Sequence, residues 1–341
     1  MSDSPTRPRI TATAYGRTDV GRQREHNEDQ FVVNPELDLF VVCDGMGGNN
    51  AGEVASALAA TSLENFFQAT ESGPVPGTPQ REDEALSEDE LRLVLGVRKA
   101  NADVHEISST RIEHQGMGST IVAVHVSRDT SSVQIAHIGD SRCYRLRQGK
   151  LEQLTRDHSL IGDALAWNPN LSEDELAGLP KNIISRALGL KRHVEVDIKT
   201  ETALPDDIYL LCSDGLSGMV KDAQIRELFQ LSDDLAEACE SLIALANDAG
   251  GSDNITAVAV RIGTDPSVSA EAPRKGSPSG PFVSVSSAAV DEPSSYVDGA
   301  TGGRSLSGAT LGRCAQCGDV SAASDAFCGQ CGARILPANT E

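Results

Sequence analysis

The chain has 341 residues, with 29 Lys and Arg against 50 Asp and Glu, so its formal net charge is −21. This balance argues against sequence-independent binding to nucleic acid or to an anionic membrane, because both require positive surface charge. The first ten residues are polar, and no apolar run approaches the roughly 20 residues that span a bilayer. We therefore expect a cytoplasmic protein with neither nucleic acid nor membrane as a partner.

Secondary-structure elements are predicted from about residue 10 to residue 263, from apolar periodicity and β-branched content. Gln148 and Gly149 lie between two predicted strands and indicate a two-residue hairpin turn, hence an antiparallel pair. Long helices between groups of antiparallel strands indicate an α+β fold with helices outside layered sheets. In chain order the elements are a strand at 37–43, helices at 51–70 and 88–108, strands at 120–126, 133–138, 142–147, 151–155 and 208–212, helices at 222–231 and 234–249, and a strand at 255–262.

The composition changes after this globular part. Residues 264–312 contain 11 Ser, 7 Gly and 5 Pro among 49 residues. Because so few apolar side chains cannot offset the entropy lost on ordering, this segment is predicted to be a flexible linker. Residues 313–336 form a Cys-rich segment that is too short to fold on hydrophobic burial alone. The predicted organisation is a domain at 10–263, a linker at 264–312 and a small module at 313–336.

The small module contains two CxxC pairs, formed by Cys314, Cys317, Cys328 and Cys331. Two such pairs place four thiolates around one tetrahedral Zn²⁺, which supplies the folding energy that so short a segment lacks. The pattern resembles a short structural zinc ribbon, and we expect it to recruit a protein partner near the domain. A redox function is the alternative, but no thioredoxin-like βαβ pattern surrounds these cysteines.

A repeated pattern in the globular part places an aspartate and a small residue directly after an apolar strand. It occurs at Asp44, Asp140 and Asp214, and Asp253 stands just before the last predicted strand. For any single instance the ordinary interpretation is a turn, in which Asp followed by a small residue is common. Four instances together predict carboxylates that gather at one edge of the sheets.

Gathered carboxylates require cations, because like charges at one edge repel one another. Sites built from oxygen ligands favour hard octahedral ions such as Mg²⁺ or Mn²⁺, and two such ions can activate a bridging water for attack on phosphorus. Arg24, near Glu28 and Asp29, is the candidate for binding phosphate, because a guanidinium group can hold two phosphate oxygens. An exposed arginine among surface acids is the alternative interpretation.

These motifs, in this order, resemble the metal-dependent protein phosphatases, the protein phosphatase 2C or PPM family, in its bacterial form. The resemblance covers about residues 18–260. It rests on Asp19, Gly21, Arg24, Asn27, Glu28 and Asp29; Asp44, Gly45, Met46, Gly47 and Gly48; Gly116, Gly118, Ser119 and Thr120; Gly139, Asp140, Ser141 and Arg142; Asp157, His158 and Ser159; Ser185, Arg186, Ala187, Leu188 and Gly189; Ser213, Asp214 and Gly215; and Gly251, Asp253 and Asn254.

The resemblance implies a four-layer αββα sandwich of two antiparallel sheets flanked by helices. It also implies two Mn²⁺ or Mg²⁺ ions at one edge of the sandwich. Asp44 would bridge both ions, the Gly45 carbonyl would bind one of them, and Asp214 and Asp253 would bind the other.

The same resemblance implies roles for the remaining polar residues. Glu28 and Asp29 would act in the metal shell, partly through water, and Asp140 would bind a weaker third ion. Arg24 would hold the substrate phosphate. The metal-bridging water would attack phosphorus directly, so no phosphoenzyme is expected.

Two positions depart from the family pattern. Met46 stands where eukaryotic relatives have a histidine, and Leu179 precedes Pro180 where many bacterial members have one. The proton donor to the leaving group is therefore unassigned. A metal-bound water is one candidate and His158 is another, although a lone histidine is more often structural. Residues 159–182 correspond to the flap beside the family's active site, which would tune substrate choice, and a solvated surface helix is the alternative.

The resemblance predicts a monomeric bacterial protein serine/threonine phosphatase that acts on phosphoproteins, the substrates of a serine/threonine kinase in the same cell. Because the motifs recognise only phosphate and metal, phosphotyrosine or a small phosphoester is an alternative substrate. A non-catalytic scaffold that presents the zinc ribbon is a further alternative, but every core metal carboxylate is present.

Overall fold

The computed structural model describes residues 9–48, 51–71, 73, 75–76, 81–172, 175–176, 178–180 and 183–264, and three short strands nearer the C-terminus. The chain divides into two compact units, residues 1–290 and 291–341. The second unit contains an antiparallel pair, β13 (Leu311–Arg313) and β14 (Val320–Ala322). The four cysteines of the predicted zinc ribbon lie outside the described residues. The ribbon therefore stays a prediction.

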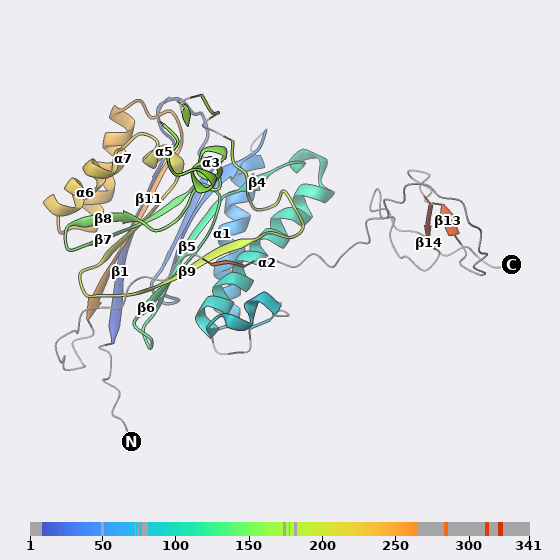
Figure 1. Ribbon diagram of the computed structural model, residues 1–341, viewed down its shortest axis with the longest axis horizontal. Coiled ribbons are helices and arrows are strands. Elements are labelled where there is room, and N and C mark those ends of the chain that lie inside the picture. The colour runs from blue at the N-terminus through green and yellow to red at the C-terminus, as the bar shows by residue number, and fades with distance from the viewer. Residues whose placement is uncertain are drawn as a thin grey trace, which may run out of the picture. The chain divides into compact units, whose positions relative to one another are not determined.

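Two antiparallel sheets form the centre of the first unit (Figure 1). The first sheet has the order β1 (Ile10–Asp19), β11 (Ile255–Thr264), β10 (Ile208–Cys212), β7 (Arg142–Arg147) and β8 (Lys150–Gln153). The second has the order β12 (Val283–Val285), β9 (Val196–Thr202), β6 (Ser132–Ile138), β5 (Ile121–Ser127), β3 (Leu39–Met46) and β2 (Asp29–Asn34). The short strand β4 (Gly118–Ser119) pairs with the end of β3.

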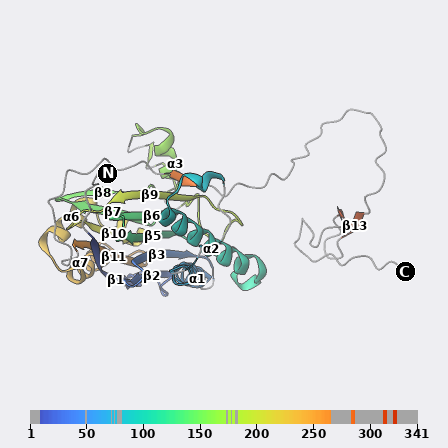
Figure 2. The same cartoon turned by 90° about the horizontal axis from the view of Figure 1, so that it is seen from below.

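Helices cover the outer face of each sheet, so the first unit has four layers (Figure 2). The helices α1 (Ala51–Ala69) and α2 (Glu88–Thr110) pack on the second sheet, and α6 (Asp222–Leu231) and α7 (Leu235–Asp248) pack on the first. The short helices are α3 (Leu160–Trp167), α5 (Asp214–Ser217), and the 3₁₀ turns η1 (Arg81–Ala85) and η2 (Ile112–His114). This architecture confirms the predicted α+β sandwich of antiparallel sheets and helices.

Local chemistry sets the start of α2. The Ser87 hydroxyl accepts a hydrogen bond from the backbone N–H of Glu90, and the Glu90 carboxylate accepts one from the backbone N–H of Ser87. This capping box satisfies amide groups that the first helical turn leaves without partners. Acidic residues in that turn also interact favourably with the positive end of the helix dipole.

The core consists of three apolar layers, one under each helix pair and one between the sheets. Successive residues of β11 alternate between two of them: Ala257 and Ala259 face the α6–α7 side, whereas Val258 and Val260 face the other sheet. Because the central strands are buried on both faces, they appear in the sequence as continuous apolar runs. That is why the central strands were predictable.

The elements missed from the sequence are less apolar. The strands β1, β2 and β9 were not predicted, and much of β1 and β2 is only partly buried.

Helix ends agree with prediction to within two residues. The strand predicted at 37–43 extends to Met46, because Gly45 and Met46 pair with β4. The predicted hairpin is confirmed, with positive φ at Gln148 and Gly149 as a type I′ turn requires.

Part of the predicted linker forms a strand. Residues 283–285 make up β12, which pairs with residues 196–198 of β9 at the edge of the second sheet. Residues 265–282 and 286–310 lie outside the described part of the chain. The flexibility of the linker therefore stays a prediction.

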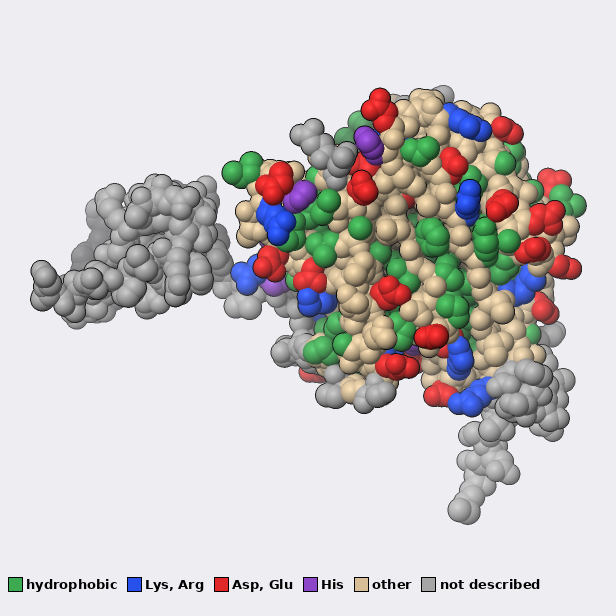
Figure 3. Space-filling view, turned by 180° about the vertical axis from the view of Figure 1, so that it is seen from behind, with side chains coloured by type: hydrophobic (Ala, Val, Ile, Leu, Met, Phe, Trp, Pro, Cys, Tyr) green, Lys and Arg blue, Asp and Glu red, His purple; other side chains and the backbone are tan. Residues whose placement is uncertain are grey.

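The surface of the first unit is mixed in charge. Figure 3 shows acidic side chains interspersed with basic ones over one face of the described residues. Among the described helices, none is both long enough and apolar enough to pass through a bilayer.

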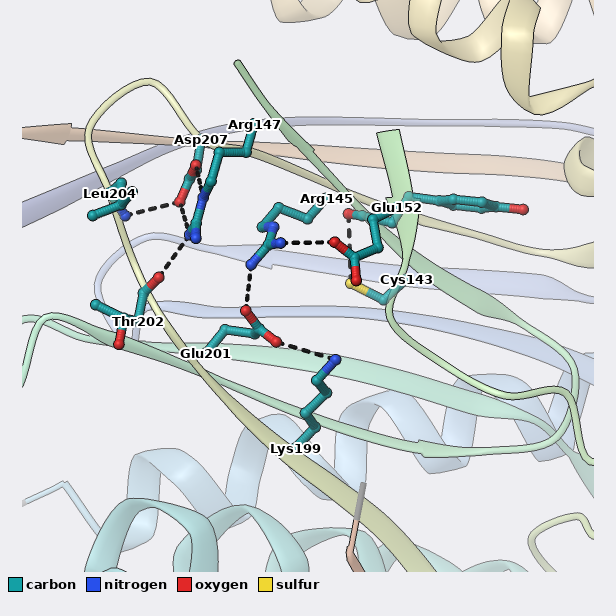
Figure 4. A network of polar contacts seen from close by, with 10 residues as sticks. Cys143, Arg145, Arg147, Glu152, Lys199, Glu201, Thr202, Leu204 and Asp207 are labelled. Carbon is teal, nitrogen blue, oxygen red and sulfur yellow. Dashed lines mark hydrogen bonds and ion pairs between the residues drawn. The ribbon is translucent and has the colours of Figure 1, made fainter. Parts of the chain in front are cut away.

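A buried network of charged side chains links the two sheets (Figure 4). Arg145 of β7 pairs with Glu201 of β9, and Lys199 pairs with the same carboxylate at 3.1 Å. Beside them, Arg147 pairs with Asp207 at 2.6 Å. Glu201 is 1% exposed, so its charge is compensated by these cations rather than by water. The network therefore attaches the β7–β8 hairpin to β9.

Removing one member of this network is expected to destabilise the fold strongly. Glu201→Ala removes the carboxylate that Arg145 and Lys199 share, and loss of one partner of a buried pair costs about 3–5 kcal/mol. Urea unfolding measures this change in the free energy of unfolding. The control is Asp129→Ala, which removes an exposed pair with Arg9 and should have little effect. Equal losses in the two variants would contradict the role of the network.

Candidate active site

Six carboxylates gather at the edge of the sandwich where β3 and β10 end. Two of them, Asp29 and Asp44, are directly opposite each other in the β2–β3 ladder. Asp214 begins α5, separated by one residue from the end of β10, and this helix lies at one end of the sheets (Figure 1). The set predicted from separate strand ends is therefore brought together by the fold. That set is Asp44, Asp140, Asp214 and Asp253, and Glu28 and Asp29 complete the six.

Burial and mutual repulsion raise the pKa of several carboxylates in this cluster. Burial raises the pKa of Asp44 well above its usual range, and the charges of Asp29, Asp214, Asp140 and Asp253 raise it further. Burial, with smaller contributions from Asp214 and Asp253, raises the pKa of Asp29 to about 7. Burial and the charge of Asp214 likewise raise the pKa of Asp140 to about 7. A cluster of this kind strongly favours bound cations.

The hydrogen-bond status of the carboxylate oxygens shows whether the cluster can hold metal ions. One carboxylate oxygen of each of Asp29, Asp140 and Asp214 is buried and has no hydrogen-bond partner among the described residues. Buried acceptors normally have a donor, so these three oxygens require another explanation. Oxygen ligands with negative charge are the ones that Mg²⁺ and Mn²⁺ prefer. The residues present therefore fit divalent cations.

Two hydroxyl groups hold Asp29 in place. Its Oδ2 accepts hydrogen bonds from Ser213 at 2.7 Å and from Thr256 at 2.6 Å. These bonds fix one side of the carboxylate, and its other oxygen, Oδ1, is buried without a hydrogen-bond partner among the described residues. The sequence carried no signal for Thr256, because its contact with Asp29 depends on the position of β11 in the sheet.

Backbone contacts position the Asp44–Gly45 pair. The amide of Asp44 donates to the Thr120 hydroxyl at 3.0 Å, and the amide of Gly45 donates to the carbonyl of Glu28 at 3.0 Å. A Cβ atom on Gly45 would lie 2.0 Å from the carbonyl oxygen of Gly52. Only glycine therefore allows α1 to approach this strand so closely.

Arg24 reaches the cluster from the loop between β1 and β2. Its Nη2 lies 2.7 Å from Oδ2 of Asp253, and 48% of the Arg24 side chain is exposed. The guanidinium group thus lies beside a predicted metal ligand and remains accessible from solvent. The sequence placed Arg24 near phosphate, and the structure places it at the carboxylate cluster.

His158 has a structural environment. It is 1% exposed, its Nδ1 accepts a hydrogen bond from the amide of Gly139 at 3.1 Å, and its Nε2 lies 3.3 Å from Asp197. Its ring also stacks on His137. A side chain enclosed in this way cannot reach a leaving group in solvent, so the structural interpretation of His158 holds.

The predicted flap includes the short helix α3. Trp167 at its end is 88% exposed, and Leu160 and Leu165 are each 37% exposed. These side chains make α3 more apolar than a typical solvated surface helix. The influence of the flap on substrate choice stays a prediction.

Comparison with known proteins identifies the family. Residues 19–256 match the family described as Protein phosphatase 2C. The chain belongs to the protein phosphatase 2C family. The serine/threonine phosphatase stp of Listeria monocytogenes is 37% identical over 249 residues, which are 72% of this chain and 93% of that protein. The protein phosphatase PhpP of Streptococcus pneumoniae is 33% identical over 248 residues, 71% of this chain and 94% of that protein.

Solved structures of family members are similar to the same part of the chain. The serine/threonine phosphatase PstP/Ppp of Mycobacterium tuberculosis is 33% identical with a TM-score of 0.63, covering 73% of this chain and 98% of that one. The catalytic domain of PstP in complex with two manganese ions is 32% identical with a TM-score of 0.63, covering 74% and 99%. About three quarters of this protein phosphatase 2C chain therefore matches nearly the whole length of these solved structures.

The raised pKa of Asp140 predicts a pH-dependent effect of its replacement by asparagine. Folded Asp140 keeps its proton up to about pH 7, whereas the unfolded chain releases it near the usual value of 3.8. Between these values the folded state binds more protons, so this residue contributes less stability as pH rises. Asp140→Asn removes the titration, so its Tm relative to the wild type should increase from about pH 5 to about pH 8 in a chelator.

The exposed variant Asp129→Asn is the control, and its Tm difference from the wild type should not change with pH. Thermal unfolding measures both differences. A Tm difference for Asp140→Asn that stays constant or decreases with pH would contradict the assignment of a raised pKa to this carboxyl.

Proposed function

We propose that this protein phosphatase 2C member is a metal-dependent protein serine/threonine phosphatase. The observation that carries the proposal is the partly buried carboxylate cluster with Arg24 beside it. Relatives that match this chain over most of their own length are named serine/threonine phosphatases. Their names support phosphoserine and phosphothreonine as the substrate class. Hydrolysis of phosphoserine and phosphothreonine is the chemistry that these features fit best.

We assign the metal ligands from the cluster. Asp44 would bind both ions, the Gly45 carbonyl would bind one, and Asp214 and Asp253 would bind the other. Support comes from the partial burial of Asp44 and Asp214 and from the buried, unpartnered Oδ1 of Asp214. Two Mn²⁺ or Mg²⁺ ions held there would supply a water of lowered pKa as the nucleophile that attacks phosphorus directly.

The outer residues complete the proposed site. Glu28 and Asp29 would act from the shell, partly through water, and Asp140 would take a third ion. One oxygen of Asp29 already accepts hydrogen bonds from Ser213 and Thr256, which supports a role for Asp29 in the shell around the metal ions. One oxygen of Asp140 is buried without a partner among the described residues, which supports Asp140 as the ligand of the third ion.

Arg24 would bind the substrate phosphate. The side chain is half exposed, and its guanidinium group can donate two parallel hydrogen bonds to phosphate oxygens, which orient the phosphate and stabilise its charge. None of Met46, Leu179 and His158 suits the proton donor to the leaving alkoxide. The first two side chains cannot donate a proton, and the third is buried. Water at the site is the remaining candidate.

The physiological substrates would be phosphoproteins made by a serine/threonine kinase of the same cell. A cytoplasmic location and a monomeric state remain predictions. The scaffold alternative is disfavoured, because all the core carboxylates are present and gathered in one place. Phosphotyrosine and small phosphoesters remain for a substrate panel to decide.

The first test is metal-dependent release of phosphate from a phosphothreonine peptide. Mn²⁺ should activate the enzyme, and a chelator should abolish activity. Asp214→Asn should lower kcat by about 100-fold or more, because metal ions contribute several kcal/mol of charge stabilisation. The control Asp129→Asn should keep wild-type activity. Indifference to the chelator, or full activity of Asp214→Asn, would reject the proposed function.

We also infer that Cys314, Cys317, Cys328 and Cys331 bind one structural Zn²⁺ in residues 313–336. The spacing of the two CxxC pairs supports this, and the first pair lies in sequence between the paired strands β13 and β14. Such a ribbon would bind a protein partner.

Metal analysis of the purified full chain tests the ribbon. One zinc per chain is expected, and the double variant Cys314→Ser, Cys317→Ser should lose it, because a structural site needs all four thiolates. Asp214→Asn is the control and should keep its zinc while losing activity. A zinc-free chain whose clustered thiols form reversible disulfides would support the redox alternative instead.

A further inference from the structure

A single buried side chain, Asn254, binds both ends of the loop that carries Arg24. Its Oδ1 accepts a hydrogen bond from the amide of Glu28 at 2.8 Å. Its Nδ2 donates to the carbonyl oxygens of Val20 and His26, each at 2.9 Å. Asn254 is 4% exposed, so these bonds are shielded from water. One amide group therefore makes three hydrogen bonds to residues 20–28.

Contacts near the two ends of the loop supplement these three bonds: the Asn27 side chain donates to the Thr18 hydroxyl at 2.9 Å, and the Glu28 carbonyl accepts from the Ser56 hydroxyl at 2.6 Å. Residues 20–28 contain no helix or strand, and residues 22–26 are exposed. Further backbone contacts come from the same neighbouring segment: the amides of Arg22 and Gln23 donate to the carbonyl of Gly251 at 2.7 and 3.2 Å. Because an exposed loop samples many conformations, fixing it before substrate arrives reduces the entropy lost on binding.

The loop also passes very close to Asp253. A Cβ atom on Gly21 would lie 2.2 Å from the carbonyl oxygen of Asp253, and the φ of Gly21 is +82°. The middle of the loop then places Arg24 Nη2 2.7 Å from the Asp253 carboxylate. Asn254, the next residue in the chain, thus holds the loop against the residue that Arg24 contacts.

We propose that Asn254 is a positioning residue that holds Arg24 over the carboxylate cluster for phosphate binding. The inference rests on the proposed function, because it takes Arg24 as the phosphate-binding group. Asn254 itself does not touch the substrate. It acts through the loop, and the sequence motif that contains it assigned it no role.

A second asparagine provides a matched control. Asn101 on α2 is 1% exposed, its Oδ1 accepts from the amide of Gly189 at 2.9 Å, and its Nδ2 donates to the carbonyls of Lys191 and Arg192 at 3.1 and 3.0 Å. The hydrogen-bond pattern is the same as that of Asn254, but its loop carries no proposed phosphate or metal ligand. Replacing either asparagine by alanine removes three equivalent hydrogen bonds without adding charge.

The kinetic experiment compares Asn254→Ala with Asn101→Ala on a phosphothreonine peptide at saturating Mn²⁺. Asn254→Ala should lower kcat/KM and raise the inhibition constant of inorganic phosphate, each by about ten-fold, the lower end of the range seen when outer-shell partners are removed. Asn101→Ala should lose similar thermal stability but leave the phosphate inhibition constant unchanged. In an Arg24→Ala background, Asn254→Ala should have little further effect, because coupled residues are not additive.

Three results would overturn the inference. One is an equal rise of the phosphate inhibition constant in Asn101→Ala. Another is full recovery of kcat/KM in Asn254→Ala when Mn²⁺ is raised above the concentration that saturates the wild type, which would place the effect on metal binding through Glu28. The third is an effect of Asn254→Ala that is unchanged in the Arg24→Ala background.

Amide hydrogen exchange gives a readout that needs no activity. Residues 20–28 should exchange faster in Asn254→Ala than in the wild type or in Asn101→Ala, and unchanged exchange would overturn the inference even in an active enzyme. An inactive wild type would instead reject the proposed function while leaving this measurement valid. If Asn254→Ala fails to fold, Asn254→Ser, which can keep one hydrogen bond, should show intermediate values in both experiments.

Discussion

Partly buried carboxylates at one edge of the sandwich repel one another, and much of the structure around them holds these like charges together. Burial is the largest cause of the raised pKa of Asp44, and four neighbouring aspartates add to it. Such a cluster is unfavourable by itself, so its geometry has to be imposed by the surrounding fold. The same unfavourable charge is what would give divalent cations their affinity for the site.

The fold imposes this geometry through its two-sided core. The strands β3, β10 and β11 lie inside their sheets and are buried on both faces, so the carboxylates at their ends cannot move apart without disturbing apolar packing. Hydroxyl groups complete the support, since Ser213 and Thr256 orient Asp29. At the far side of the sheets, the network around Glu201 joins β7 to β9 with opposite charges.

The phosphate-binding part is built differently from the metal-binding part. The proposed metal ligands lie at the ends of strands, whereas Arg24 lies on an exposed loop that hydrogen bonds from Asn254 hold in place. A loop gives the guanidinium group access to solvent and substrate, and a buried amide restricts its position. The exposed apolar side chains of α3 form another accessible part of the protein phosphatase 2C domain, where sequence can vary without affecting the core.

The sequence alone determined the long helices, the central strands, the strand-end aspartates and the candidate role of Arg24, because each depends on local periodicity or on a short motif. Tertiary structure decided which of these residues meet. Asn254 and Glu28 are 226 positions apart, and no local pattern predicts that their groups form a hydrogen bond. The partly exposed strands β1 and β2 likewise lack a strong apolar signal and are specified by pairing with β11 and β3. Local preferences can be read along a chain, but long-range contacts exist only after the strands have paired.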